Sequence, residues 1–210
     1  MQNLQGELEN LSRSQLRRRQ DILCASLEIF ERDGFEAARM ADIAEAAGVA
    51  KGTIYLYFEN KVALLEGVIQ SSIIPTLKEL GETAELPDGS AEEILSSQMQ
   101  ITVQRMASPQ MRTLLRHMIS GGPKQQGRLI RFYFANVVQP AIELIGQTLK
   151  NGVESGEFRE EAGKIDPLVL VGAQIYTTVW KILFEEIAPI DETSLSADLT
   201  EISLRGLLKT

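Results

Sequence analysis

The chain has 210 residues, of which 44% are hydrophobic and 24% charged, and its formal net charge is −8. These values fit a globular protein of one or two domains, and no apolar run approaches the roughly 20 residues of a membrane-spanning helix. A single cysteine, Cys24, excludes an internal disulfide, and the polar N-terminus lacks the apolar stretch of a signal peptide. We therefore expect a cytoplasmic protein that has no membrane partner.

The negative charge does not by itself exclude a nucleic-acid partner. Residues 1–62 carry eight Lys/Arg and ten Asp/Glu, which is a net −2, whereas residues 63–210 carry thirteen and nineteen, a net −6. Binding to phosphates depends on where cations lie locally. The acidity belongs mostly to the larger C-terminal part, so composition leaves DNA binding open.

Helical periodicity extends over almost the whole chain, and strand patterns are absent. In chain order, helices are expected over residues 14–32, 40–47, 51–58, 60–80, 90–107, 108 to about 122, 124–154, 166–187 and 196–208. Ser90 with Glu93 forms a capping-box pattern, and Ser108 precedes Pro109 at a helix start. Pro75 is expected to kink or shorten its helix. The sequence thus predicts an all-α fold of about nine helices, with a compact N-terminal trio and a larger helical body.

The second and third helices are short and meet at Gly48-Val49-Ala50, which is the pattern of a helix-turn-helix. On a helical wheel, Ile54 and Phe58 share the face that must be buried. Gly52, Thr53, Leu56 and Tyr57 fall on the opposite face, although a solvated helix usually carries Lys or Glu there. A glycine in the first turn suggests close approach by another molecule.

The segment "MADIAEAAGVAKGTIYLYFENKVALLEGVI" closely resembles the DNA-binding signature of the TetR/AcrR family of bacterial transcriptional regulators. The detailed resemblance covers about residues 16–70, and the chain length and helix count also fit the family. It implies a homodimer whose paired recognition helices lie in successive major grooves of double-stranded DNA. Together with the helix boundaries, it leads us to expect a helix-turn-helix domain over residues 14–60 and a regulatory and dimerisation domain over 61–210. The polar N-terminal sequence predicts a flexible tail, 1–13, before them.

The resemblance also implies which residues contact DNA. Lys51 and Thr53 match positions that approach bases, while Tyr55, Tyr57 and Lys61 match positions that hold phosphates. Gly52 and Leu56 complete the expected surface, and we hypothesise that Leu56 contacts a thymine methyl group. Arg39 either binds phosphate or is a plain surface arginine. The Arg13 and Arg17–Arg19 cluster likewise either grips phosphates or forms a solvated face.

Two helix starts depart from the family pattern. Ala50 stands where serine is frequent, and Ala38 with Arg39 stand where threonine or serine is usual. Without a side-chain cap, the recognition helix loses on the order of 1 kcal/mol of stabilisation.

The helix expected over 166–187 is apolar nearly all round and must be buried on two sides. A second copy of the chain can cover the second of these two sides. Members of the family dimerise through their last two helices. The expected interface residues are Val171, Ile175, Val179, Leu183, Leu199 and Ile202.

Four methionines form two pairs at a spacing of seven, Met99 with Met106 and Met111 with Met118. They either fill the core or line a deformable pocket for an apolar ligand. The candidate ligand-binding residues are Met99, Met106, His117, Met118, Phe132, Tyr176 and Trp180. His117 alternatively is a surface residue or a satisfied core residue.

The sequence therefore predicts a sequence-specific DNA-binding transcriptional regulator, and the family majority makes it a repressor. A small, largely apolar effector would release it from a palindromic operator. The alternative is a helical small-molecule-binding protein with a vestigial DNA-binding head. An enzyme is not expected, because the chain lacks a phosphate loop, a nucleophile motif and a metal-ligand cluster. Neither a cofactor nor a metal is expected.

Overall fold

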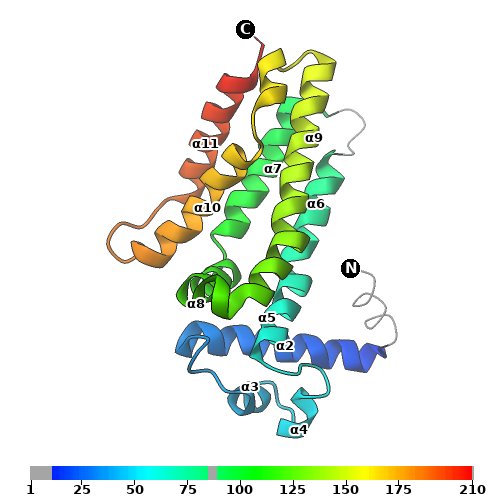
Figure 1. Ribbon diagram of the computed structural model, residues 1–210, viewed down its shortest axis with the longest axis vertical. Helices are drawn as coiled ribbons and strands as arrows, with labels where there is room; N and C mark the ends of the chain where they lie inside the picture. The colour runs from blue at the N-terminus through cyan, green and yellow to red at the C-terminus, as the bar shows by residue number, and fades with distance from the viewer. Residues whose placement is uncertain (1–10, 85–88, 210) are drawn as a thin grey trace.

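A computed structural model describes residues 11–84 and 89–209 (Figure 1). These residues form helices and no strand, apart from an isolated bridge between Phe158 and Leu208, which confirms the all-α prediction. In chain order the elements are α2 (Arg13–Asp33), α3 (Met40–Ala46), α4 (Lys51–Ile54), α5 (Lys61–Val68), the π-helix η1 (Ile69–Ile73), α6 (Ile74–Ala84), α7 (Ala91–Met106), α8 (Pro109–Tyr133), the π-helix η2 (Phe134–Val138), α9 (Gln139–Ser155), the 3-10 helix η3 (Glu160–Lys164), α10 (Leu168–Leu183) and α11 (Glu192–Leu207).

The N-terminal helices α2, α3 and α4 form a head at one end of the molecule, and the remaining helices form an elongated body (Figure 1). One hydrophobic cluster runs from the head into the body. Ile22 and Ile54 of the head share it with Leu64 of α5 and Leu114 of α8, all of which are almost fully buried. The hydrophobic core is therefore continuous between the head and the body.

The start of α2 is fixed by a capping box. The Ser12 hydroxyl accepts a hydrogen bond from the Gln15 N–H, and the Gln15 side chain accepts one from the Ser12 N–H. Ser12 and Arg13 of the expected tail therefore belong to the cap and first turn of α2. The rest of that tail, residues 1–10, lies outside the described residues.

Two long helices contain a π-helical turn next to a proline. Pro75 has no N–H to give to the Ser71 carbonyl, and Pro140 has none for the Asn136 carbonyl. The backbone opens instead to bonds five residues apart, from Ile74 N–H to the Ile69 carbonyl in η1 and from Gln139 N–H to the Phe134 carbonyl in η2.

The predicted helix end near residue 122 is wrong. Helix α8 continues through Gly121-Gly122-Pro123 to Tyr133, and the interruption comes later, at η2. Packing of α8 between the head and the body supports the helix across residues of low helix propensity. The capping box of Ser90 and Glu93 at α7 is confirmed, as is the Ser108 cap of α8.

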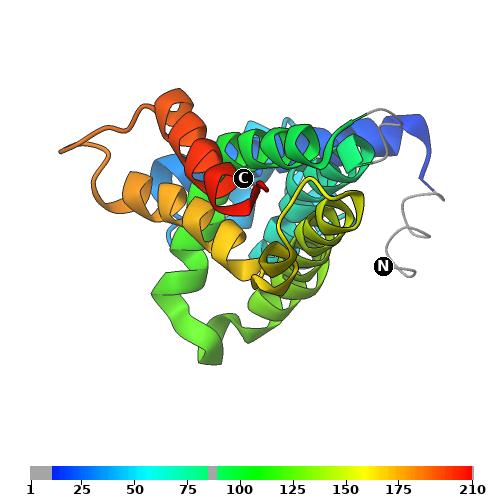
Figure 2. The ribbon, with the colours of Figure 1, turned by 90° about the horizontal axis from the view of Figure 1, so that it is seen from above.

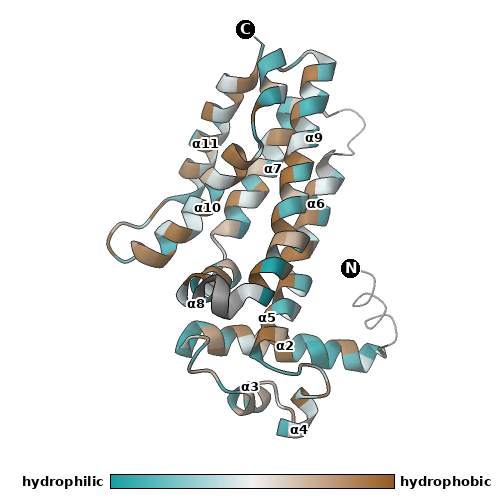
Figure 3. Ribbon diagram, in the orientation of Figure 1, coloured by the Kyte–Doolittle hydropathy of each residue, from teal (hydrophilic) through white to brown (hydrophobic). Residues whose placement is uncertain are grey.

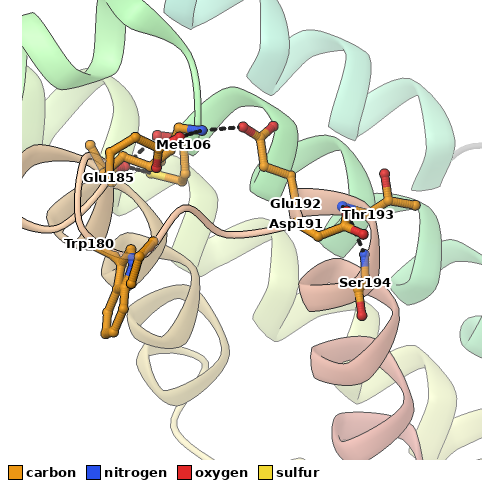
Figure 4. Close-up of polar contacts among 10 residues, drawn as sticks. Met106, Trp180, Glu185, Asp191, Glu192, Thr193 and Ser194 are labelled. Atoms are coloured by element: carbon orange, nitrogen blue, oxygen red, sulfur yellow. Dashed lines mark hydrogen bonds and ion pairs between the residues drawn. The ribbon is translucent and has the colours of Figure 1, made fainter.

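Helices α10 and α11 both pack against α7 and lie together on one side of the body (Figures 1 and 2). Helix α11 begins four residues earlier than predicted, because the Asp191 carboxylate accepts hydrogen bonds from the Thr193 and Ser194 N–H groups (Figure 4). Helix α10 ends at Leu183, short of the predicted residue 187.

Candidate functional site

The helix-turn-helix of the head is built on a glycine turn. Gly48 has φ +65°, a conformation that lets the chain reverse between α3 and α4, and the Val49 N–H donates to the Ala44 carbonyl at 2.9 Å. Ile54 and Phe58 have exposed fractions of 0% and 4%, so the predicted buried pair is confirmed. Helix α4 is thereby held against the head core through one side only.

The outer surface of α4 and the following turn carries exposed residues of unusual character. Leu56 is 83% exposed and Tyr55 48% exposed, and Lys51 and Gly52 are also exposed. Apart from its chain neighbours and the backbone of its own helix, nothing lies within 4 Å of where a Cβ of Gly52 would be, so packing against other parts of the chain does not require a glycine there.

The predicted wheel over 51–58 is partly wrong, because regular helix ends at Ile54 and residues 55–57 form a turn. The change of backbone geometry turns Tyr55 outward, whereas Tyr57 is half-buried against the head core. Thr53 is also half-buried. The structure thus brings all the expected DNA-contacting residues of α4 and its turn to one end of the head, with different exposure.

Both helix starts of the motif lack a side-chain cap, as the sequence predicts. Neither Arg39, the N-cap of α3, nor Ala50, the N-cap of α4, forms a side-chain capping hydrogen bond. Arg39 is exposed.

Lys61, at the first position of α5, contacts the loop between α2 and α3. Its Nζ donates to the Phe35 carbonyl at 2.6 Å and to the Glu36 carbonyl at 2.9 Å, and it lies 4.8 Å from the centre of the Phe35 ring. An ammonium group has three N–H donors. Two of them anchor this loop, which leaves one for a partner outside the chain.

The arginine cluster of α2 divides into two parts. Arg13, Arg17 and Arg18 are exposed. Arg19 instead donates to Gln70 Oε1 at 3.1 Å and lies 5.1 Å from the Phe58 ring centre, and burial lowers the pKa of its guanidinium. Arg19 therefore contributes to the packing of α2 against η1 and against Phe58.

Helix α8 joins the body to the head at two places. The His117 ring stacks on the Phe35 ring with centroids 3.6 Å apart, and its Nδ1 is 3.7 Å from Glu36 Oε1. Further along, Arg128 donates two hydrogen bonds to the Glu66 carboxylate, at 2.8 and 2.9 Å. Phe35 thus lies between His117 of the body and Lys61 of α5.

The body contains a small, almost wholly apolar cavity of about 50 Å³ between the two hydrophobic clusters. It is lined by Ile73, Leu77, Leu80, Thr102, Arg105, Met106, Met111, Val137, Ala141, Leu144, Ile145, Val171 and Gln174. Two of these residues, Ile73 and Val137, belong to the π-helical turns η1 and η2.

Of the seven expected ligand-binding residues, Met106 lines this cavity. Met99 is buried in the second cluster, whereas His117 and Met118 are buried on α8, and Phe132 is half-buried against the first cluster. Tyr176 is 55% exposed on α10, and Trp180 donates its Nε1–H to the Ala188 carbonyl at 2.7 Å. The structure therefore does not gather these seven residues around one space.

The expected interface residues lie on α10 and α11 with graded exposure. Val171 is buried within its own protomer, whereas Ile175, Val179 and Leu199 are half-buried. Leu183 and Ile202 are 59% and 70% exposed. Other large apolar side chains are exposed beside them, and Figure 3 shows hydrophobic ribbon at the exposed lower end of α10. An apolar face of this extent needs a covering partner.

Residues 11–84 and 89–209 offer neither a metal-binding cluster nor a helix that could cross a membrane. This part of the chain contains no cluster of three or more His, Cys, Asp or Glu residues able to hold a metal ion. None of its helices combines the length and apolar character that crossing a membrane requires.

Comparison with known proteins agrees with the geometry of the head. Residues 22–68 match the family model described as bacterial regulatory proteins, tetR family. The HTH-type transcriptional regulator SrpR of Pseudomonas putida is 30% identical over 140 residues, which cover 67% of this chain and 63% of SrpR. The chain thus spans less than two thirds of the length of that relative.

Solved structures share the whole fold. The fatty acid degradation regulator FadR from Bacillus halodurans superposes with a TM-score of 0.72 and 24% identity, covering 90% of this chain and 95% of that one. The transcriptional regulator FadR from Bacillus subtilis, in complex with stearoyl-CoA, superposes with a TM-score of 0.68 and 20% identity, covering 89% and 98%.

Proposed function

Since the chain belongs to the TetR family of bacterial regulators, we propose that it is a homodimeric transcriptional repressor that a small apolar ligand releases from a palindromic operator. The observation that carries this proposal is the outer surface of α4 and its turn. Lys51 and Gly52 are exposed on this short helix, Tyr55 and Leu56 are exposed in the turn that follows it, and Ile54 holds the other side of the helix in the core. Such a surface fits the major groove, where helix N-terminal residues contact base edges.

The expected DNA-contacting residues of the head have distinct roles in this proposal. Lys51, Gly52 and Thr53 approach the bases, and Leu56 contacts a thymine methyl group. Tyr55, Tyr57, Arg39 and the third N–H of Lys61 bind phosphates, which position the protein without reading sequence. Exposed Arg13, Arg17 and Arg18 add phosphate contacts from α2 and partly offset the overall negative charge.

Gly52 provides the sharpest test of groove binding. Because a Cβ at this position would meet no atom of the chain, Gly52→Ala is expected to stabilise the fold by about 0.5–1 kcal/mol through helix propensity. If the backbone at Gly52 approaches DNA closely, the same change weakens DNA binding.

The experiment is a gel shift with the DNA upstream of the protein's own reading frame, paired with urea unfolding. A variant that is more stable and binds the DNA less tightly supports the proposal. If Gly52→Ala binds the DNA as tightly as the wild type, the backbone at Gly52 does not approach the DNA closely. Leu56→Ala, measured in parallel, should relax preference at one operator position, and unchanged preference everywhere contradicts the thymine contact.

For the regulatory half of the proposal, the apolar cavity is the effector site. At about 50 Å³ it is smaller than the ~150 Å³ that accommodates benzene, so a ligand must widen it. The cavity lining can move most easily at the π-helical turns that carry Ile73 and Val137, because the backbone of such turns can shift its hydrogen-bond register.

Helix α8 provides the route from cavity to head. Met111 lines the cavity, and His117, six residues further along the same helix, stacks on Phe35 of the head. A ligand that displaces α8 therefore changes the position of the α2–α3 loop and, through Lys61, of α5. In a dimer this movement alters the separation of the two recognition helices, which must match successive major grooves.

The dimer forms through the exposed apolar face of α10 and α11, with Leu183 and Ile202 among its residues. We assign the chain no catalytic role, which agrees with relatives that are regulators. The alternative, a ligand-binding protein with a vestigial head, predicts no sequence-specific gel shift from a confirmed dimer.

A further inference from the structure

The segment between α10 and α11, residues 184–191, forms an arm that extends away from the helices of the body (Figures 1 and 2). Two contacts hold it. The Trp180 Nε1–H donates to a backbone carbonyl of the arm at 2.7 Å, and Lys181 Nζ donates to the carboxylates of Glu185 and Glu192, which lie at the two ends of the arm (Figure 4). The position of the arm is therefore fixed by contacts within one protomer.

The outer side of the arm combines apolar side chains with a carboxylate. Phe184 is 40% and Ile187 82% exposed, and Leu183, directly before the arm, is 59% exposed. Glu186 is also exposed, and it forms no ion pair or hydrogen bond with any residue that the structure describes. Exposed apolar side chains gathered on a fixed segment mark an interaction surface.

A groove of about 450 Å³ lies beside the arm, where the end of α2, the start of α8 and the end of α10 meet. Pro109, Leu183 and Ile187 form apolar parts of its lining, and Arg112 and Arg116 line it from successive turns of α8. Neither arginine has an ion pair or a hydrogen bond to its side chain within residues 11–84 and 89–209. Arg112 is half-buried, so its guanidinium has lost part of its hydration without gaining an opposite charge.

The unpaired charges of this groove are self-complementary. Besides Arg112 and Arg116, the lining contains the carboxylates of Glu31 and Glu186, which are likewise unpaired in the described part of the chain. In an interface with two-fold symmetry the same surface of both subunits meets, so each copy must supply the charges that the other needs. The groove also borders the exposed apolar face of α10 through Leu183, so a second copy that covers this face reaches the groove.

We propose that the arm of each protomer docks in the groove of the other, with Ile187 against the apolar lining and Glu186 paired with the partner's Arg112 and the partner's Arg116. This inference rests on the dimer of the proposed function, and it extends the dimer interface from α10 and α11 to α8. Two identical contacts form, because each protomer contributes one arm and one groove.

The docked arm contacts α8 on the route from the effector cavity to the head. Arg112 directly follows Met111, which lines the cavity, and Arg116 directly precedes His117, which stacks on Phe35 of the head. The arm of one protomer therefore limits the movement of α8 in the other. Through this contact, the response of one head to the effector depends on the partner subunit.

The test uses charge reversal between chains. Dimer dissociation constants are measured by analytical ultracentrifugation of the full chain, for the wild type, Glu186→Arg, Arg116→Glu and the double variant. Glu160→Arg is the matched control, because Glu160 is an exposed and unpaired carboxylate of η3 among the described residues and does not line the groove. Equal amounts of the two single variants are then mixed, and native mass spectrometry separates homodimers from heterodimers by mass.

Each single reversal places like charges together in both contacts of its homodimer, so we expect the dimer to weaken roughly tenfold or more. The double variant should dimerise more tightly than either single variant. In the mixture, the heterodimer regains one wild-type contact and one reversed contact, so it should exceed the share that random pairing gives. A contact within one chain cannot produce this preference.

The inference is overturned if both single variants dimerise as tightly as Glu160→Arg, if the mixture contains heterodimers only at the random share, or if the wild type is a monomer. Gel shifts with the same samples separate this inference from the proposed function. A dimeric wild type that shifts DNA while the variants pair at random refutes the arm contact alone. Preferred heterodimers without any sequence-specific shift by the wild type refute the repressor alone.

Discussion

Replacing Lys61 with methionine removes an ammonium group that the structure uses inside the head and that the family resemblance assigns to DNA. Its Nζ holds the Phe35 and Glu36 carbonyls at 2.6 and 2.9 Å and lies over the Phe35 ring. Charged donors contribute about 1.5–3 kcal/mol per hydrogen bond when desolvated. A cation over an aromatic ring at an exposed site adds about 0.5–1 kcal/mol.

Because Lys61 is only half-buried, water replaces part of these interactions after the substitution. We therefore expect a loss of about 2 kcal/mol in the free energy of unfolding, less than the sum of the separate contributions. The remaining N–H is free to bind a phosphate. Losing that contact reduces the slope of log K against log salt by about 0.9 for each phosphate.

The assay combines urea unfolding, followed by circular dichroism, with DNA affinity measured at several salt concentrations. Lys51→Met is the matched control, because Lys51 is exposed and no ion pair or hydrogen bond of its side chain is found in the described residues. It should change the free energy of unfolding by less than about 0.5 kcal/mol. If the two variants are equally stable, Lys61 does not anchor the loop between α2 and α3. If the salt slope of Lys61→Met equals that of the wild type, Lys61 does not contact a phosphate.

Three further predictions, which use four substitutions, test other parts of the structure. Gly152→Ala places a Cβ 2.2 Å from the buried Phe158 ring and should destabilise the fold by about 1–3 kcal/mol, whereas Gly206→Ala, which meets nothing within 4 Å, should be neutral or stabilising in thermal unfolding. Ala50→Ser supplies the missing cap of α4 and should stabilise the protein by about 1 kcal/mol in urea; no gain would mean that the cap geometry is unsuitable. Burial raises the pKa of the Tyr133 hydroxyl to about 12, above its ordinary value of 10.0. The contribution of the neutral hydroxyl to the free energy of unfolding is therefore fully present below pH 10 and is lost as the pH rises toward 12. Tyr133→Phe should therefore show a shallower loss of stability over that window than the wild type, and parallel curves would contradict the assignment.

The head was largely predictable because its signals are local. Gly48, the Ile54–Phe58 pair and the missing caps act within a few residues, and the structure bears them out. What failed was the extrapolation of one helical wheel through residue 58. The backbone leaves the helix after Ile54, which exchanges the exposure of Tyr55 and Tyr57.

The body was less predictable because its features depend on tertiary contacts. Helix α8 continues past Gly121-Gly122-Pro123, where local propensity indicates an end, since it packs on both head and body. The methionine spacing identified Met106 at the cavity, but spacing cannot tell which buried face adjoins an empty space. The contact of His117 with Phe35 joins residues far apart in sequence, so no local pattern could reveal it.

The central claim, that the head reads a palindromic DNA site as a dimer, is tested most directly by selection from random duplex DNA with the full-length protein at moderate salt. The account predicts enrichment of a near-palindrome whose half-site centres lie about 10 base pairs, or a multiple of that, apart. A confirmed dimer that enriches no sequence, or that enriches a single unpaired half-site, would contradict it.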